Sequence, residues 1–153
     1  MTYEELQILN EDLNIKEMDL SGVPGLKGLY VDGNIAIDKS MTTTEKACVL
    51  AEELGHHYTS VGNILDLSDV QNRKQELRAR LWGYNNKVGL LGIIQAYKHR
   101  CQNLTEMADL LDVTEQFLAE ALEQYRRKYG YKVEIDNYVI FFEPRLAVME
   151  KLT

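Results

Sequence analysis

Two adjacent glutamates, Glu52 and Glu53, are followed closely by two adjacent histidines, His56 and His57. Residues four positions apart share one face of an α-helix, so Glu52 and His56 are placed to hold one metal ion together. Glu53 lies next to that face and would polarise a water molecule bound to the ion. The spacing is that of the zinc-binding His-Glu-x-x-His motif, with Glu52 at the position of the first histidine.

The same residues allow other interpretations. A solvated helix face with a simple Glu–His pair four residues apart needs no metal. The spacing Glu53-x-x-His56 also occurs in di-iron carboxylate bundles, but those need a second Glu-x-x-His, which this sequence lacks. His57 points about 100° away from His56 on a helix, and it is the alternative ligand. Tyr58 is a candidate for oxyanion stabilisation.

The helix that carries these residues is expected to begin near Thr42. Thr42 and Glu45 have the spacing of a capping box, in which each side chain satisfies a backbone N–H at the start of the helix. An apolar stripe follows at helical spacing, and its members are Ala47, Leu50, Ala51, Leu54 and Tyr58.

A second amphipathic helix is expected from about Ser68 to Asn86, after a loop that opens at Gly62. Leu77, Leu81 and Tyr84 are its expected core positions. This helix offers Glu76 as a third metal ligand.

The remaining pattern predicts a mixture of helices and short strands. A helix is expected over 2–14, a hairpin of strands over 28–31 and 35–37 with Asp32-Gly33 at its turn, and a helix over 89–100. Residues 104–129 read as two helices broken at 112–114, and 131–135 with 138–142 as a second hairpin. We expect two parts, 1–100 with the site helix and 101–153 as a helical subdomain ending in the hairpin, packed as one unit.

Composition limits the classes of function. The chain has 153 residues and a formal net charge of −7. An acidic chain is a poor general binder of nucleic acid, because phosphate contacts draw on Lys and Arg. No apolar run is long enough to span a membrane, and the acidic first residues do not form a secretory signal. The expected location is therefore the cytoplasm, with no membrane partner.

Over most of its length the chain resembles the ImmA/IrrE-type metallopeptidases, which are common in phages and mobile elements. The resemblance runs through the segment Gly28–Ile37 and the segment Leu50–Tyr58, and continues through Glu76-x-x-Ala79 and Trp82. It implies an α+β fold: a mostly helical, zincin-like metallopeptidase domain with a small antiparallel sheet and a C-terminal helical subdomain.

The resemblance also implies a site and a substrate. His56 matches the second motif histidine, Glu53 the catalytic glutamate and Glu76 the downstream ligand, whereas Glu52 departs from the family pattern. One divalent ion is implied, with zinc the first choice and manganese or iron(II) as alternatives. Family members cleave or antagonise a helix-turn-helix repressor, so a protein substrate of that kind is expected.

Three functional hypotheses follow. The first is a metal-dependent endopeptidase, and the second is an antirepressor that binds the repressor without cutting it, which Glu52 favours. The third is a DNA-binding protein, since residues 104–129 resemble a helix-turn-helix. Glu115, Glu120 and Glu123 in the second helix would repel phosphates, so we interpret this region as a helical substrate-binding subdomain.

Overall fold

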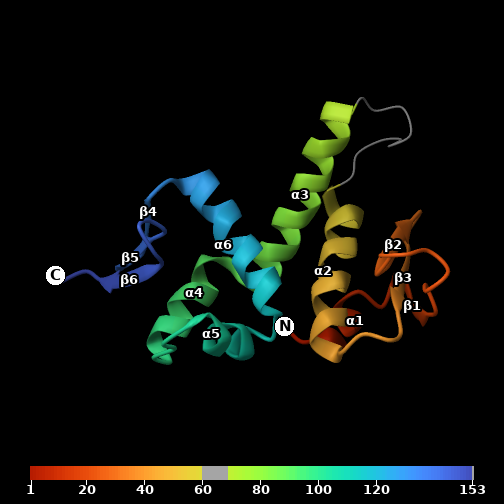
Figure 1. The fold of residues 1–153 in the computed structure, drawn as a ribbon, viewed down its shortest axis with the longest axis horizontal. Coiled ribbons are helices and arrows are strands. Elements are labelled where there is room, and N and C mark those ends of the chain that lie inside the picture. The colour runs from red at the N-terminus through yellow and green to blue at the C-terminus, as the bar shows by residue number, and fades with distance from the viewer. Residues whose placement is uncertain (60–68, 153) are drawn as a thin grey trace. The chain divides into compact units, whose positions relative to one another are not determined.

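The computed structural model describes residues 1–59 and 69–152, with the backbone alone for residues 69 and 70 (Figure 1). The loop expected from Gly62 to Ser68 lies outside the described residues. The helices are α1 (Tyr3–Leu9), α2 (Thr43–Thr59), α3 (Asp69–Lys87), α4 (Gly89–Lys98), α5 (Leu104–Leu111) and α6 (Glu115–Tyr129). The strands are β1 (Asn14–Met18), β2 (Gly28–Val31), β3 (Asn34–Asp38), β4 (Lys132–Ile135), β5 (Tyr138–Phe141) and β6 (Ala147–Glu150). The α+β class is confirmed.

The first sheet has the strand order β1-β3-β2 and is mixed, not purely antiparallel as expected. The β2–β3 hairpin is confirmed, with Asp32 and Gly33 at positive φ in its turn. The helix predicted over 2–14 was too long. It ends at Leu9, where the Asn10 side chain donates to the Leu6 carbonyl oxygen at 2.8 Å, and the chain then forms β1 parallel to β3.

Helices α1 and α2 pack against this sheet and form the core of the first part of the chain. Leu50 and Leu54 of α2 are fully buried, together with Ile35 and Ile37 of β3 and Leu6 of α1. The start of α2 is fixed as expected, because the Thr42 hydroxyl oxygen accepts from the Glu45 backbone N–H at 3.2 Å. Burial of the stripe on one side turns the opposite side of α2, with Glu52 and His56, away from the core.

Helix α3 lies directly against α2 (Figure 1). A Cβ atom built on Gly55 would lie 2.1 Å from the carbonyl oxygen of Ala79, and one on Gly83 would lie 3.2 Å from the carbonyl of Ala51. The two backbones therefore touch at these positions, and any larger side chain at Gly55 would push the helices apart. This contact turns Leu77 outward, so the expectation that Leu77 belongs to the core was wrong: it is 42% exposed.

The second part of the chain contains α4, α5, α6 and a sheet of order β4-β5-β6. The break between α5 and α6 is confirmed: Asp112 adopts φ 54°, and the Thr114 hydroxyl oxygen accepts from the Phe117 N–H at 3.0 Å. The hairpin β4–β5 is confirmed, and β6 is a third strand that was not predicted.

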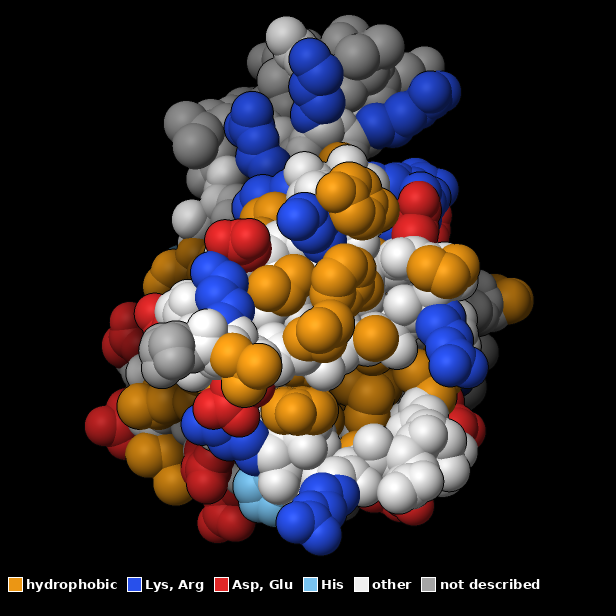
Figure 2. All heavy atoms as spheres, turned by 90° about the vertical axis from the view of Figure 1, so that its left-hand side faces the viewer, with side chains coloured by type: hydrophobic (Ala, Val, Ile, Leu, Met, Phe, Trp, Pro, Cys, Tyr) orange, Lys and Arg blue, Asp and Glu red, His pale blue; other side chains and the backbone are white. Residues whose placement is uncertain are grey.

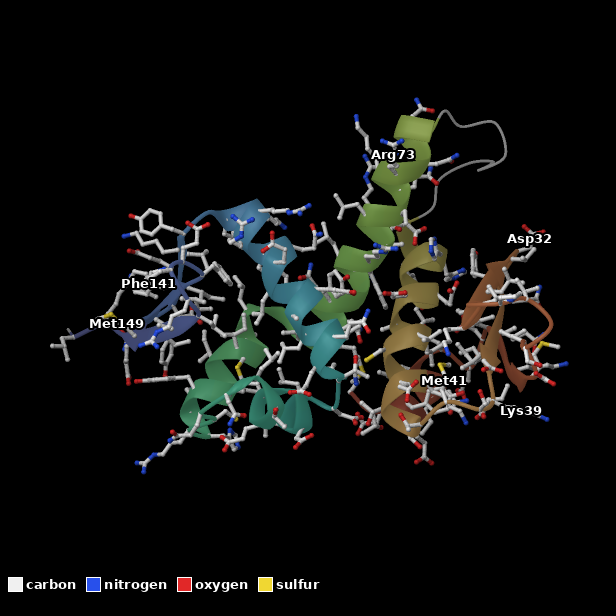
Figure 3. The ribbon with its side chains drawn as sticks, viewed as in Figure 1. Asp32, Lys39, Met41, Arg73, Phe141 and Met149 are labelled. Carbon is white, nitrogen blue, oxygen red and sulfur yellow. The ribbon has the colours of Figure 1, made fainter. Side chains whose placement is uncertain are left out.

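Phe141 and Met149 (Figure 3) project from one face of this sheet. Figure 2 shows apolar side chains gathered on the side of the molecule that it views.

By its internal contacts the chain divides into two compact units, Met1–Lys87 and Val88–Thr153. The division into domains at residue 100 stays a prediction. Among the described residues no helix is long and apolar enough to cross a membrane.

The α2–α3 contact generates a prediction about stability. Gly55→Ala should lower the free energy of unfolding by about 1–3 kcal/mol, the usual cost of overpacking, even though alanine favours a helix by about 1 kcal/mol over glycine. Denaturant unfolding followed by circular dichroism measures the difference. Gly22→Ala is the control, because nothing lies within 4 Å of its added methyl group. Equal stability of Gly55→Ala and the unmodified protein would show that the helices do not depend on this close approach.

Candidate active site

His56 of α2 and Glu76 of α3 meet on one side of the two helices. His56 Nε2 lies 3.2 Å from Glu76 Oε2, and both side chains are only partly exposed. The hydrogen bond with Glu76 raises the pKa of His56 above its ordinary value, and the same contact lowers the pKa of Glu76. The sequence-predicted pair of ligands from two different helices is therefore brought together. We call the side of the α2–α3 pair that carries these two residues the active-site face.

Glu53 lies beside this pair and is largely buried. Burial is the main cause that raises the pKa of Glu53 to about 7, and the neighbouring charges of Glu52 and Glu76 raise it further, whereas His56 opposes the rise. Three carboxyl groups thus interact around one imidazole. Of these groups Glu53 is the one held in a poorly solvated position.

Strand β2 lies against Glu53. A Cβ atom on Gly28 would lie 3.2 Å from Glu53 Oε1 and 2.5 Å from Val49 Cγ1. Only glycine lets the backbone of β2 approach α2 this closely. The edge strand and the largely buried carboxyl group are thus neighbours, and this role of Gly28 was not predicted from its sequence position.

His57 and Tyr58 lie elsewhere on α2. The Nδ1 atom of His57 shares a hydrogen bond of 2.8 Å with the Tyr30 hydroxyl of β2. The Tyr58 ring stacks on Trp82 with 5.1 Å between ring centroids, and its hydroxyl donates to Asn10 Oδ1. Tyr58 is half exposed, so its place in the apolar stripe is only partly as predicted. Neither residue joins the His56–Glu76 pair in this arrangement.

Arg80 also belongs to the site, and the sequence analysis missed it. Its Nε atom lies 3.6 Å from Glu76 Oε1, one helical turn along α3. The signal was present, because Arg80 follows Glu76 at the i,i+4 spacing of helical ion pairs.

The donor set suits a divalent cation in chemistry and in charge. Carboxylate oxygens and an imidazole nitrogen are the ordinary ligands of zinc, manganese and iron(II), and a cation would offset the repulsion that raises the pKa of Glu53. In the described part of the chain, however, no group of three or more His, Cys, Asp or Glu side chains is close enough to hold a metal ion as it stands. His56 and Glu76 meet, but the third ligand does not complete the group.

Comparison with known proteins identifies a family for this chain. No curated protein and no solved structure gives a significant match to the chain. A family model does match: it is described as the IrrE N-terminal-like domain of a peptidase family, and it covers residues 4–123, which include α2, α3 and every candidate site residue. This is a family of metallopeptidases, which implies in general a protein substrate and a metal cofactor. The chain therefore belongs to the IrrE N-terminal-like family of peptidases.

Proposed function

We propose that this protein is a metal-dependent endopeptidase that acts on a helix-turn-helix repressor of a phage or mobile element. The observation that carries the proposal is the meeting of His56 and Glu76 at 3.2 Å, with the buried Glu53 beside them, on the two helices of the family match. Membership of a peptidase family supports a protein substrate. The repressor is supported by the family resemblance and by the net charge of −7, which disfavours direct binding to DNA.

His56, Glu76 and Glu52 are the residues that would hold the ion. When bound, a divalent cation supplies Lewis acidity: it polarises the scissile carbonyl and makes water more acidic. In this proposal Glu53 is the general base, which takes a proton from the attacking water and returns it to the leaving amine. The position of Glu53 favours this role, because its carboxyl group lies, largely buried, beside His56 and Glu76 and is not one of the proposed ligands.

The other aromatic and imidazole groups have positioning roles in this scheme. The hydrogen bond between His57 and Tyr30 ties α2 to β2, so it orients the strand that touches Glu53. We propose a structural role for Tyr58, since its hydroxyl already donates to Asn10 and its ring packs on Trp82.

A second function, a non-catalytic antirepressor, is favoured by one specific observation. Glu52 stands where the family motif has a histidine. Such a protein would bind its repressor and inactivate it without cleavage. Incubation of the purified protein with a candidate repressor, followed by electrophoresis with and without added metal, distinguishes the two functions: fragments support the peptidase, and an intact complex supports the antirepressor.

The first prediction concerns metal binding. Protein stripped with chelator should bind one divalent ion per chain in calorimetric titrations with zinc and with manganese. His56→Ala and Glu76→Gln should each weaken binding by at least about tenfold, because each removes a ligand. His99→Ala is the control, since His99 is an exposed residue at the end of α4. A protein that binds neither ion would rule out the metal site.

The second prediction concerns Glu53. Glu53→Gln keeps the shape of the side chain but cannot accept a proton from water. Cleavage of the repressor should slow by at least about a hundredfold, the usual contribution of a general base, while metal affinity is retained because Glu53 is not a ligand. Unchanged cleavage by this variant would show that Glu53 is not the base.

The third prediction concerns Glu52. A carboxylate in place of a neutral imidazole adds a negative charge beside the cation, which reduces its strength as a Lewis acid, and oxygen ligands shift the preference from zinc towards manganese or iron(II). Glu52→His should therefore bind zinc more tightly and cleave the same substrate faster. Both proteins are compared after stripping and reloading with zinc and with manganese. If Glu52→His binds neither ion, Glu52 does not replace the motif histidine, and His57 becomes the next ligand to test.

A further inference from the structure

Helix α3 carries a local concentration of positive charge in an otherwise acidic protein. Arg73, Lys74, Arg78 and Arg80 lie within one short segment of α3, whereas the whole chain has a net charge of −7. All four side chains are exposed. Arg73 lies in the N-terminal half of the helix (Figure 3). The segment surrounds Glu76, so the positive charge lies at the candidate site.

The four positively charged side chains lie on two different sides of α3, as helical geometry requires. Glu76 faces His56 at 3.2 Å, and residues three before and four after it share its side of the helix. These residues are Arg73 and Arg80, and the distance of 3.6 Å between Arg80 Nε and Glu76 Oε1 agrees with this placement. Lys74 and Arg78 lie on the far side of α3, where they line a separate polar hollow.

The two arginines therefore flank the active-site face along α3. They lie seven residues apart, which corresponds to a rise of about 10 Å along a helix. An extended peptide covers a similar length, about 10 Å, in three residues. A guanidinium group binds a carboxylate with two parallel hydrogen bonds, so acidic side chains a few residues apart on a peptide could meet both arginines.

We propose that Arg73 and Arg80 select acidic peptides at the active-site face, with the acidic side chains on the α3 side of the bound chain. This inference rests on the proposed function, because it assigns a substrate class to the same site. It gives Arg73 and Arg80 the role of specificity-determining residues, outside the groups that carry out the reaction.

The charge of the site favours a peptide over a nucleic acid. Glu52 and Glu53 lie on α2 close to the active-site face, and Glu53 is affected electrostatically by Glu52 and Glu76. A nucleic acid carries a phosphate at every nucleotide, so some of its phosphates would lie beside these carboxyl groups. A peptide can place its acidic side chains at the arginines and its uncharged backbone at the carboxyl groups.

The test measures the binding of three fluorescent peptides that share an apolar centre and differ in the residues on one side. The acidic peptide carries Asp and Glu there, the neutral peptide carries Gln, and the basic peptide carries Lys. Fluorescence polarisation is recorded with the full-length Glu53→Gln variant, so that the peptides are not cleaved. Each measurement is made both without and with added metal. The double variant Arg73→Gln with Arg80→Gln is compared with Lys74→Gln with Arg78→Gln. Both pairs remove two positive charges from the same helix, so a general effect of net charge is the same in both.

The expected result is that the acidic peptide binds at least about tenfold more tightly than the Gln peptide, as for a charged pair worth about 1.4 kcal/mol. This preference should disappear in the Arg73/Arg80 variant and remain in the Lys74/Arg78 variant. Equal binding of the acidic and Gln peptides, no binding of the acidic peptide, or equal losses in the two variants would each overturn the inference. Tighter binding of a single-stranded oligonucleotide than of the acidic peptide would also overturn it.

Failure of the inference and failure of the proposed function give different results. A protein that prefers acidic peptides through Arg73 and Arg80 but cleaves no repressor with any metal keeps the inference and loses the peptidase function. Metal-dependent cleavage of the repressor with no charge preference in the binding assay keeps the peptidase function and overturns the inference.

Discussion

The direct backbone contact between α2 and α3 is the constraint on which the candidate site depends. Gly55 lies against the backbone of Ala79, and Gly83 lies against the backbone of Ala51. Larger side chains at these positions would move the two helices apart and change the distance between residues on their facing sides. The closeness of these small residues therefore helps to set the distance at which Glu76 meets His56.

The same packing creates the electrostatic character of the site. Packing of α2 between the sheet and α3 reduces the contact of Glu53 with water, and Gly28 lets the backbone of β2 approach its carboxyl group. Desolvation alone disfavours a carboxylate, and the nearby acidic groups add to that effect. This fold places a largely buried carboxyl group near two others, and the charges of His56 and Arg80 partly balance them. The burial of Glu53 and the closeness of its charged neighbours therefore both follow from the packing of α2 against α3 and β2.

Local signals in the sequence were enough to predict most of the helices and both hairpins, but not the strands β1 and β6 or the orientation of the helices. The capping pair Thr42 and Glu45 and the apolar stripe fixed α2, because helix caps and periodicity act within a few residues. The exposure of Leu77 was missed because the rotation of α3 depends on its contact with Gly55, more than twenty positions away. The pairing of His57 with Tyr30 was missed for the same reason. The parallel strand β1 was missed since its partner β3 follows only after a long connection.

The charges of the ligands and of the flanking arginines have separate effects on an approaching substrate. If Glu52 and Glu76 hold a divalent ion, their two negative charges cancel its two positive charges, so the loaded centre exerts little net attraction on a distant peptide. Arg73 and Arg80 are then the positive charges nearest to the centre on α3, and their field extends over roughly one Debye length, about 8 Å at physiological ionic strength. A His-rich centre would keep a net positive charge and attract anions by itself. With this proposed ligand set, glutamate in place of the motif histidine would shift the electrostatic selection of a substrate from the ion to the arginines of α3.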